Sequence, residues 1–409
     1  MMAVAMDPIQ SRRHFLRFLA ASPLFAHAAL AQSPPADPIL WAPRDVTRLI
    51  ADPGQALDVF DFEPVMRNAV PPAHFGYMTT GIDDEVTLRA NRAGFQKFEL
   101  LPRRLIDVSK IDMRTEILGT TYDSPIFVCP TASNKAYHPD GEIAVANAAK
   151  AGNHLEMLST VATTSIEAVI AARGGPVWYQ LYPTSKWEVG VAMAQRAERA
   201  GSPAIVITVD GLAAQNWETL ARLRRSDTRP CGDCHGRALK DYLARKPNFD
   251  GIDLTGANFN ATGFTWESVR RLRDIVKTKI VLKGILARED ARLAAENGID
   301  AIILSNHGGR NDDNGRSTID ALPGILEAAG RMPVLIDSGF RRGTDIVKAL
   351  ALGATAVGIG RPYLWGLGAF GQPGVERVLE ILRRETHAVM QQMGAPTIKD
   401  LVPAMVRRA

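Results

Sequence analysis

The segment Ser305–Arg310, with the sequence Ser-Asn-His-Gly-Gly-Arg, combines residue types that suit proton transfer and carboxylate binding. It follows the apolar run Asp300–Leu304, which is typical of a buried strand. The imidazole of His307 can take up a proton near neutral pH, and the planar guanidinium of Arg310 can hold a carboxylate through two hydrogen bonds. A strand-end loop with a structural histidine would show the same pattern, so the surrounding elements must decide between these interpretations.

Eight short apolar runs alternate with helical patterns from Pro125 onward. The runs are Pro125–Pro130, His154–Ser159, Pro176–Tyr182, Ala204–Asp210, Lys279–Gly284, Ala301–His307, Pro333–Gly339 and Ala356–Pro362. This alternation predicts an α/β fold, a (β/α)8 TIM barrel, with an N-terminal helical extension and a long loop after strand 4. That loop covers residues 211–263 and has the length of a lid. An open doubly wound sheet is the alternative, although no G-x-G-x-x-G follows the first strand.

A polar or phosphate-compatible group follows each predicted strand. These groups are Thr131, Ser159, Gln180 with Tyr182, Thr208 with Asp210, Lys283, His307, Asp337 and Gly360-Arg361. The active site of a (β/α)8 barrel lies at the C-terminal ends of its strands, so we expect these groups to share one face. Lys283 lies in an otherwise apolar run, which favours an ammonium inside the barrel mouth over a surface lysine.

Glycines and arginines occur together in the two loops after the last predicted strands. Asp337–Gly343 reads Asp-Ser-Gly-Phe-Arg-Arg-Gly, and Gly358–Pro362 reads Gly-Ile-Gly-Arg-Pro. Glycines allow close backbone approach, arginines neutralise negative charge, and loops 7 and 8 are the usual phosphate site of a barrel. The two loops therefore predict a phosphate site, although ordinary turns can contain the same residues.

The composition is that of a globular protein, with 46% hydrophobic and 22% charged residues among 409. The net charge is +4, and the first 31 residues contain three arginines and one aspartate, so the remainder carries +2. This weak charge gives no support for a nucleic-acid partner. We also expect no metal site.

The N-terminal residues have the pattern of an export signal. Ser11–Leu16 contains twin arginines, Phe18–Leu30 is apolar, and Ala29–Ala31 resembles a cleavage site. The apolar stretch is too short to span a membrane. We therefore predict a twin-arginine-type signal peptide at residues 1–31, a linker at 32–45, and a periplasmic protein whose barrel occupies 46–409. A basic tail without a signal function is the alternative.

The chain contains three cysteines, too few for a disulfide framework. Cys129 lies in an apolar run and is expected to be buried. Cys231, Cys234 and His235 form the pattern C-x-x-C-H, which in the periplasm is typical of haem c attachment. A local disulfide, or a reduced pair with no role, is the alternative.

Several motifs occur in a characteristic order along the chain. They are Gly81–Leu88, Pro130-Thr-Ala132, Tyr179–Tyr182, Thr208-Val-Asp210, Lys283-Gly284, Ser305–Arg310, Asp337–Gly343 and Gly360-Arg361-Pro362. Together they resemble the FMN-dependent α-hydroxy-acid dehydrogenase/oxidase family, which includes glycolate oxidase and flavocytochrome lactate dehydrogenase. The resemblance runs from about Val46 to the C-terminus, excluding most of the long loop. It implies FMN as the cofactor, a 2-hydroxy acid as the small-molecule substrate and a homotetramer.

The resemblance implies a role for each matching residue. Catalysis is expected from His307 as the base, from Lys283 as the cation that stabilises the reduced flavin, and from Tyr182. Tyr77 and Tyr182 match the two substrate tyrosines, and Arg310 matches the carboxylate clamp. The residues expected to bind FMN are Pro130, Thr131, Ala132, Ser159, Gln180, Thr208, Lys283, Ser305, Asp337, Gly339, Arg341, Gly360 and Arg361.

One position departs from the family pattern. The family usually carries a second substrate arginine shortly after the Thr-Val-Asp strand, and this chain has Trp217 there. The indole could stack on an aromatic or larger substrate, or simply fill the space. We therefore predict that small acids such as glycolate and lactate bind weakly. An arginine of the lid (Arg222, Arg224 or Arg225) could substitute, but no spacing selects one.

These residues suit the oxidation of a 2-hydroxy acid to a 2-oxo acid. The reaction needs a base, a carboxylate clamp and a cation beside the reduced flavin, which His307, Arg310 and Lys283 provide. The residues leave open whether the α-hydrogen departs as hydride or proton. We predict that electrons pass to a periplasmic acceptor, a cytochrome or a quinone. The alternatives are an oxidase that uses oxygen and releases hydrogen peroxide, a non-redox flavin-binding barrel, and a degenerate barrel that only binds.

Overall fold

The computed structural model describes residues 49–212, 215–229 and 239–409. The chain divides into Met1–Leu49 and Ile50–Ala409, and every element below belongs to the second unit. The predicted signal peptide and linker, and the C-x-x-C-H segment of the lid, lie outside the described residues. Within the described part of the chain, no helix is long and apolar enough to cross a membrane.

Eight parallel strands close into a barrel, which confirms the predicted fold and rules out the open sheet. The strands are β4 (Ile126–Val128), β5 (Leu155–Ser159), β6 (Val177–Leu181), β7 (Ala204–Thr208), β8 (Lys279–Ile285), β9 (Ala301–Leu304), β10 (Val334–Ile336) and β11 (Ala356–Ile359). They follow each other around the barrel in chain order, and β11 pairs with β4 to close it. Seven of these strands fall inside an apolar run of the sequence, and β8 extends one residue beyond its run, to Ile285.

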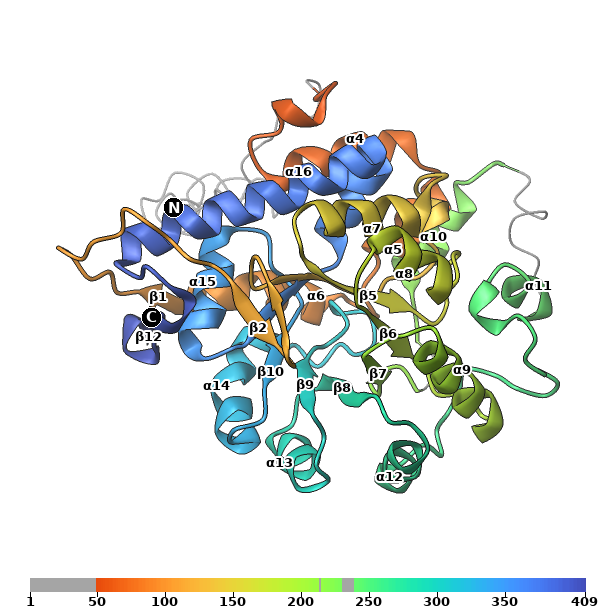
Figure 1. Cartoon of the computed structure of the whole chain (residues 1–409). Coiled ribbons are helices and arrows are strands. Elements are labelled where there is room, and N and C mark those ends of the chain that lie inside the picture. Colours follow the sequence, from red (N-terminus) through yellow and green to blue (C-terminus); the bar gives the residue numbers. More distant parts are fainter. Residues whose placement is uncertain (1–48, 213–214, 230–238) are drawn as a thin grey trace, which may run out of the picture. The chain divides into compact units, whose positions relative to one another are not determined.

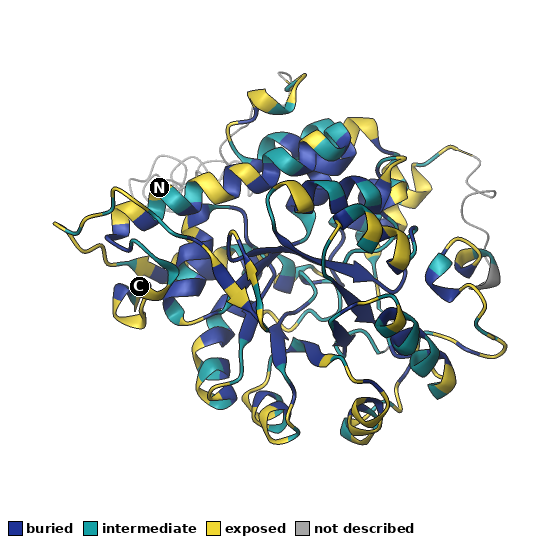
Figure 2. Cartoon of the chain, in the orientation of Figure 1, coloured by how far each residue is buried: buried dark blue, intermediate teal, exposed yellow. Residues whose placement is uncertain are grey.

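Helices surround the barrel strands (Figure 1). They are α7 (Gly141–Ala151), α8 (Ile166–Arg173), α9 (Trp187–Arg199), α12 (Trp266–Ile275), α13 (Arg288–Glu296), α14 (Thr318–Ala329), α15 (Gly343–Leu352) and α16 (Arg361–Met393). The last of these is kinked at Phe370 and Gly371, where the backbone leaves the helical region. The strands are buried on both faces because helices cover them outside and side chains fill the barrel inside (Figure 2).

Short elements close the ends of the barrel. The N-terminal extension contains α4 (Phe62–Ala69), α5 (Pro72–Thr79) and α6 (Val86–Ala93), and two small sheets pair β1 (Phe98–Leu100) with β12 (Val406–Arg408) and β2 (Thr115–Ile117) with β3 (Thr120–Tyr122). The 3-10 helices are Pro53–Gln55, Val59–Asp61, Gly94–Lys97, Asn134–Ala136, Pro247–Phe249, Ile398–Asp400 and Pro403–Met405. Ile117 and Tyr122 pack with Phe127, Leu155 and Trp178 in the interior cluster, so the β2–β3 hairpin plugs the N-terminal end of the barrel.

The long loop after β7 contains helices as well as irregular chain. Its described part includes α10 (Glu218–Arg225) and α11 (Leu239–Leu243). The α10 helix packs against α5 of the N-terminal extension. This contact matters for the site, because Trp217 caps the start of α10 and Tyr77 lies on α5.

Candidate active site

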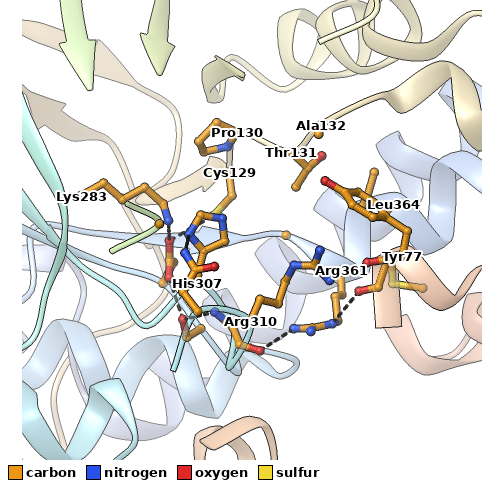
Figure 3. A pocket seen from close by; sticks show the side chains of 18 of the residues that line it. Tyr77, Cys129, Pro130, Thr131, Ala132, Lys283, His307, Arg310, Arg361 and Leu364 are labelled. Carbon is orange, nitrogen blue, oxygen red and sulfur yellow. Dashed lines mark hydrogen bonds and ion pairs between the residues drawn. The ribbon is translucent and has the colours of Figure 1, made fainter. Parts of the chain in front are cut away.

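The strand ends open into one pocket at the C-terminal end of the barrel (Figure 3). The predicted site residues that line it are Tyr77, Pro130, Thr131, Ala132, Tyr182, Trp217, Lys283, His307, Arg310, Asp337, Gly339, Arg341, Gly360 and Arg361. Four other predicted residues, Ser159, Gln180, Thr208 and Ser305, are buried at strand ends without lining the pocket. The expectation of one shared face therefore agrees with the structure, and the role of each residue remains a prediction.

His307 lies three residues beyond the end of β9 and adopts a left-handed backbone conformation with φ of 55°. Such a conformation costs a non-glycine residue roughly 1–2 kcal/mol. The hydroxyl of Ser305 holds it by accepting a hydrogen bond from the His307 backbone N–H at 3.0 Å. The strained backbone aims the imidazole across the barrel mouth, where Nδ1 lies 2.9 Å from Asp210 Oδ1 and Nε2 lies 3.1 Å from the Tyr182 hydroxyl.

Other segments of the chain approach Gly308 and Gly309 so closely that only glycine fits at these two positions. Both have positive φ, and a Cβ at Gly308 would lie 2.5 Å from Arg361 Nη1. A Cβ at Gly309 would lie 2.5 Å from the backbone N of Leu88. The two glycines thus let α6 and the guanidinium of Arg361 reach the loop that carries the candidate base and clamp.

The surroundings of His307 favour a neutral imidazole that can accept a proton. Burial and the positive charge of Lys283 lower the pKa of His307 below its ordinary value of 6.5, while Asp210 opposes them. Asp210 is buried, which works against ionisation, but His307 and Lys283 hold its pKa below the usual range. Asp210 therefore fixes the Nδ1–H tautomer and leaves Nε2 as the proton acceptor.

Asn311 joins this pair, although no sequence pattern singled it out. Its Nδ2 lies 3.0 Å from Asp210 Oδ1 and 2.8 Å from His307 Nδ1. Because Nδ1–H already donates to Asp210, the consistent arrangement has both groups donating to the same carboxylate oxygen. The other oxygen, Asp210 Oδ2, is buried and has no hydrogen-bond partner among the described residues.

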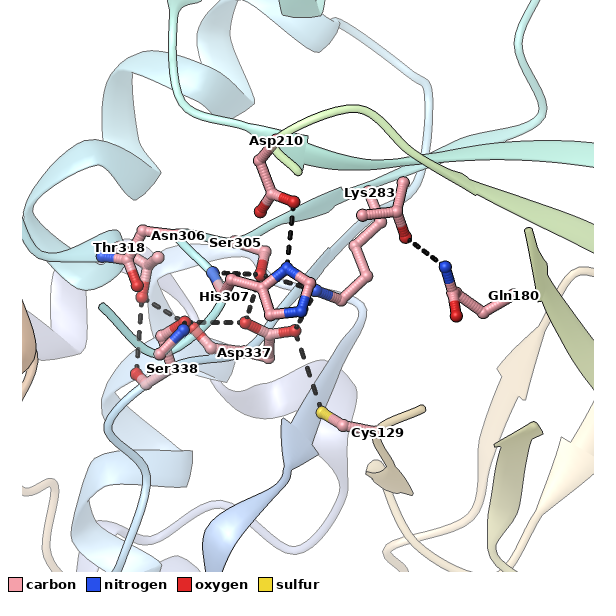
Figure 4. A network of polar contacts seen from close by, with 12 residues as sticks. Cys129, Gln180, Asp210, Lys283, Ser305, Asn306, His307, Thr318, Asp337 and Ser338 are labelled. Atoms are coloured by element: carbon pink, nitrogen blue, oxygen red, sulfur yellow. Dashed lines mark hydrogen bonds and ion pairs between the residues drawn. The ribbon is translucent and has the colours of Figure 1, made fainter. Parts of the chain in front are cut away.

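A second buried network surrounds Lys283 (Figure 4). The Lys283 ammonium donates to Ser305 Oγ at 3.0 Å and lies 3.5 Å from Asp337 Oδ2, and Ser305 Oγ donates to Asp337 Oδ1 at 2.6 Å. Burial works against the charge, but Asp337 and Asp210 raise the pKa of Lys283 above its ordinary value. The barrel thus keeps a permanent positive charge at the pocket floor. Cys129 Sγ lies 3.8 Å from Asp337 Oδ2 and, as predicted, is buried.

Arg310 is held between two aromatic rings. Its guanidinium carbon lies 4.9 Å from the Tyr77 ring centroid and 5.0 Å from the Trp217 ring centroid. Its Nη1 donates to the carbonyls of Tyr77 and Thr80. The exposed lid residues Arg222, Arg224 and Arg225 are absent from the described pocket lining, whereas Arg310 belongs to it.

Two further arginines, the buried Arg341 and the partly buried Arg361, line the pocket. Arg361 lies beside Arg310, since both guanidinium groups donate to the Thr80 carbonyl. Burial lowers the pKa of Arg341 to about 9, with help from Arg92 and Arg361. Burial and Arg310 likewise lower the pKa of Arg361 to about 9. Buried cations that repel one another are suited to a bound anion, and α15 and α16 begin at these loops with their positive dipole ends.

These residues fit FMN. Arg341, Arg361, Gly339 and Gly360 would hold its phosphate, and the Lys283 ammonium would face the ring system. A Cβ at Gly360 would meet only Cys129 Cβ, at 4.0 Å, so backbone there is accessible to a phosphate oxygen. Arg361 already donates to the carbonyls of Met78, Gly308 and Thr80, whereas the recorded hydrogen bond of Arg341 is to the Phe340 carbonyl. Arg341 is therefore the freer phosphate ligand.

Sequence reasoning missed the aromatic residues that complete the pocket. Tyr137, Tyr242 and Phe259 line it together with the predicted site residues. Tyr242 and Phe259 come from the lid and pack edge to face at 6.4 Å. Lid residues have no spacing rule, so no sequence signal could have found them. Asp210 had a signal, its position at a strand end, but was given no role.

Comparisons with known proteins agree with this geometry. Residues 66–408 match the model of the FMN-dependent dehydrogenase family. The chain is 37% identical over 360 residues to a peroxisomal (S)-2-hydroxyacid oxidase of Arabidopsis thaliana, which covers 86% of this chain and 97% of the relative. It is 40% identical over 348 residues to the L-lactate oxidase of Lysinibacillus sphaericus, covering 83% and 90%. A soluble mutant of the membrane-associated (S)-mandelate dehydrogenase from Pseudomonas putida has a similar structure, with a TM-score of 0.79, 36% identity and coverage of 87% and 100%.

The chain belongs to the FMN-dependent dehydrogenase family. It is an (S)-2-hydroxy-acid oxidase/dehydrogenase family enzyme that oxidises 2-hydroxy acids to 2-oxo acids with FMN. The non-redox flavin barrel and the barrel that only binds are therefore set aside.

Proposed function

We propose that this enzyme is a 2-hydroxy-acid dehydrogenase with His307 as the base and Arg310 as the carboxylate clamp. In this proposal, electrons leave the reduced flavin for a cytochrome or quinone in the periplasm. The observation that carries the residue roles is that Tyr182 and Asp210 contact the two ring nitrogens of His307 in the pocket that Arg310 also lines. His307 Nε2 lies 3.1 Å from the Tyr182 hydroxyl, His307 Nδ1 lies 2.9 Å from Asp210, and Arg310 lines the same pocket.

The chain's own groups take one of the two hydrogens and bind the charges of the reaction. FMN, when bound, supplies the acceptor for the two electrons and for the hydrogen that His307 does not take. The 2-hydroxy acid loses its hydroxyl proton and its α-hydrogen together with two electrons, which leaves the 2-oxo acid. Arg310 binds the carboxylate, His307 Nε2 takes a proton, and Asp210 stabilises the imidazolium that forms. Lys283 contributes positive charge at the pocket floor for the negative charge that arises on reduction.

The choice of acceptor rests on the N-terminal signal. A twin-arginine address suits a protein that folds around a non-covalent cofactor before export, because a threaded chain would lose that cofactor. An exported enzyme would find cytochromes and quinones as neighbours. Fractionation of cells that express the full chain tests the address, and replacement of Arg12 and Arg13 by lysine should keep the protein inside. An unchanged distribution would remove the support for a periplasmic acceptor.

The test of the acceptor starts from reduced enzyme. Anaerobic addition of a panel of aliphatic and aromatic 2-hydroxy acids should bleach the flavin. Reoxidation of that enzyme is then timed with oxygen, with a quinone and with a one-electron dye, and peroxide is assayed. A dehydrogenase reoxidises with the quinone or dye much faster than with oxygen. Stoichiometric peroxide at full turnover would instead establish an oxidase.

An oxygen-using oxidase is the second candidate. The names of the relatives favour it, since those from Arabidopsis thaliana and Lysinibacillus sphaericus are oxidases. The name of the Pseudomonas putida relative favours a dehydrogenase. The reoxidation experiment decides between the two.

Two further parts of the proposal have direct tests. A haem c at Cys231, Cys234 and His235 would give electrons an exit within the chain, and a purified periplasmic sample without a pyridine haemochrome spectrum would remove it. The homotetramer that the family resemblance implies would appear as four chain masses in light scattering, and a monomer mass would contradict it.

A further inference from the structure

Trp217 contacts the candidate carboxylate clamp in three ways. Its indole Nε1 donates a hydrogen bond to the Arg310 carbonyl at 3.0 Å. Its ring lies 5.0 Å below the Arg310 guanidinium carbon, and its edge meets the Tyr77 ring at 5.8 Å and 84°. The guanidinium lies between the two perpendicular rings. The hydrogen bond from Trp217 restrains the backbone of Arg310, and the cation–π contacts with both rings restrain its side chain.

This arrangement limits what Arg310 can bind. Its Nη1 is used by the Tyr77 and Thr80 carbonyls, and no hydrogen bond from Nε or Nη2 to another described residue is recorded. The edge of the guanidinium formed by Nε and Nη2 therefore remains available for a ligand, and this edge can bind one carboxylate through two hydrogen bonds. The other pocket-lining guanidinium near it, Arg361, already donates to four carbonyls. A second carboxylate on a ligand would find no further clamp.

The substrate side of the pocket is otherwise aromatic. Tyr137, Tyr242 and Phe259 line it with Trp217, and the Arg222 and Glu218 side chains of α10 pair with each other at the surface. Aromatic rings prefer to pack edge to face or offset against another ring, so the ring faces favour an aromatic group, whereas a small hydroxylated anion can use only the tyrosine hydroxyls. A glycolate or lactate would leave this surface in contact with water.

We propose that Trp217 determines substrate choice in this enzyme. It replaces a second cationic clamp with an aromatic surface that fixes Arg310 and accepts an aromatic or large apolar group of a 2-hydroxy monocarboxylate. The inference deepens the proposed function and rests on it, since it concerns the substrate of the same site.

The test compares two substrates in three variants. Anaerobic flavin reduction by (S)-mandelate and by glycolate gives a dissociation constant and a limiting rate for each. Trp217→Arg adds a second charged donor, so glycolate should bind roughly 10- to 100-fold more tightly while mandelate gains less. Trp217→Leu removes the ring, so the preference for mandelate should fall roughly three- to tenfold. Trp217→Phe keeps a ring face and should retain most of that preference.

The control is Trp187→Phe, because Arg271 lies 4.4 Å above the Trp187 ring, in a cation–π pair between α9 and α12 and outside the pocket lining. Trp187→Phe should leave the preference for mandelate over glycolate unchanged. A merely structural Trp217 would alter stability and both substrates equally, so an unmoved ratio in Trp217→Arg and Trp217→Leu would overturn the inference alone. Saturation of the wild type by micromolar lactate would also overturn it. If no 2-hydroxy acid bleaches the wild type, the proposed function fails together with the inference.

Discussion

Two regions of the barrel bury ionisable groups and treat them in opposite ways. At the C-terminal ends of the strands, Lys283 lies 3.5 Å from Asp337 and His307 lies 2.9 Å from Asp210. At the N-terminal end of β5, Glu156 is 2% exposed and one of its oxygens, Oε2, has no hydrogen-bond partner among the described residues. Its neighbours Leu155 and Met157 point into the barrel, so Glu156 faces the helix layer.

The difference shows in the direction of the pKa shifts. Burial raises the pKa of Glu156 to about 8 and lowers that of His154 to about 4, so each of these groups is neutral at pH 7. In the active site, opposite charges overcome burial, so Asp210 and Lys283 stay charged. At Glu156 the nearby Arg173 opposes burial without overcoming it, whereas the direct partners of Asp210 and Lys283 overcome it. Such oppositely charged partners lie at the C-terminal ends of the strands, where the candidate active site is.

The largest expected effect comes from removing His307, the candidate proton acceptor of the charged region. His307→Gln should lower the limiting rate of flavin reduction by about 10²- to 10⁴-fold, because no group replaces the proton acceptor. Rapid-mixing absorbance under anaerobic conditions measures this rate. The matched control is His154→Gln, which changes the buried histidine of the other region and should leave the rate unchanged while lowering stability. Equal losses in both variants would contradict the contrast.

Removing the cation of the buried pair should lower both the stability and the rate of flavin reduction. Lys283→Met leaves Asp337 buried without its cation and should lower the free energy of unfolding by about 3–5 kcal/mol. The double variant Lys283→Met/Asp337→Asn should recover much of that loss in urea unfolding but not the rate of flavin reduction. Recovery of both would show that Lys283 serves stability alone.

In the neutral region, the contribution of Glu156 to stability should fall as the pH rises. The pKa of Glu156 is raised from 4.5 to about 8, so the folded chain keeps a proton that the unfolded chain releases between these values. Stability from this group is full below pH 4.5 and is lost as pH rises toward 8. Glu156→Gln should therefore stabilise the protein by about 2–3 kcal/mol at pH 7 and have little effect at pH 4.5. Calorimetric melting at both pH values measures this, and an equal gain at both would refute the assignment.

The smallest expected effect concerns Asn311. Asn311→Ala removes a donor to Asp210, so the carboxylate should act more strongly on the His307 imidazolium and raise the pKa of His307. We expect the acid limb of the pH–rate profile to move to higher pH, with a loss in rate of about fivefold. Asn314→Ala, on the same loop but outside the pocket lining, is the control. A shift toward lower pH would contradict the assigned hydrogen bonds.

The sequence predicted the parts of the site that lie at strand ends. The eight apolar runs give the barrel, and barrel closure places His307, Lys283 and Asp337 on one face, so residue type and position sufficed for them. The contact of Asn311 with Asp210, and of Trp217 with Arg310, depends on how loops distant in sequence pack together. The aromatic lid residues Tyr242 and Phe259 obey no period, and the β2–β3 hairpin that plugs the barrel has no signal distinct from a surface turn.

In the proposed mechanism, His307 acts as a neutral base whose proton affinity Asp210 controls. The most direct test is the pH dependence of anaerobic flavin reduction in the wild type and in Asp210→Asn. Because burial and Lys283 lower the pKa of His307, the rate of the wild type should fall only below pH 6.5. Because Asp210 raises that pKa, the acid limb of Asp210→Asn should move to still lower pH. An acid limb at or above pH 6.5 in the wild type, or one that moves upward in Asp210→Asn, would contradict the account.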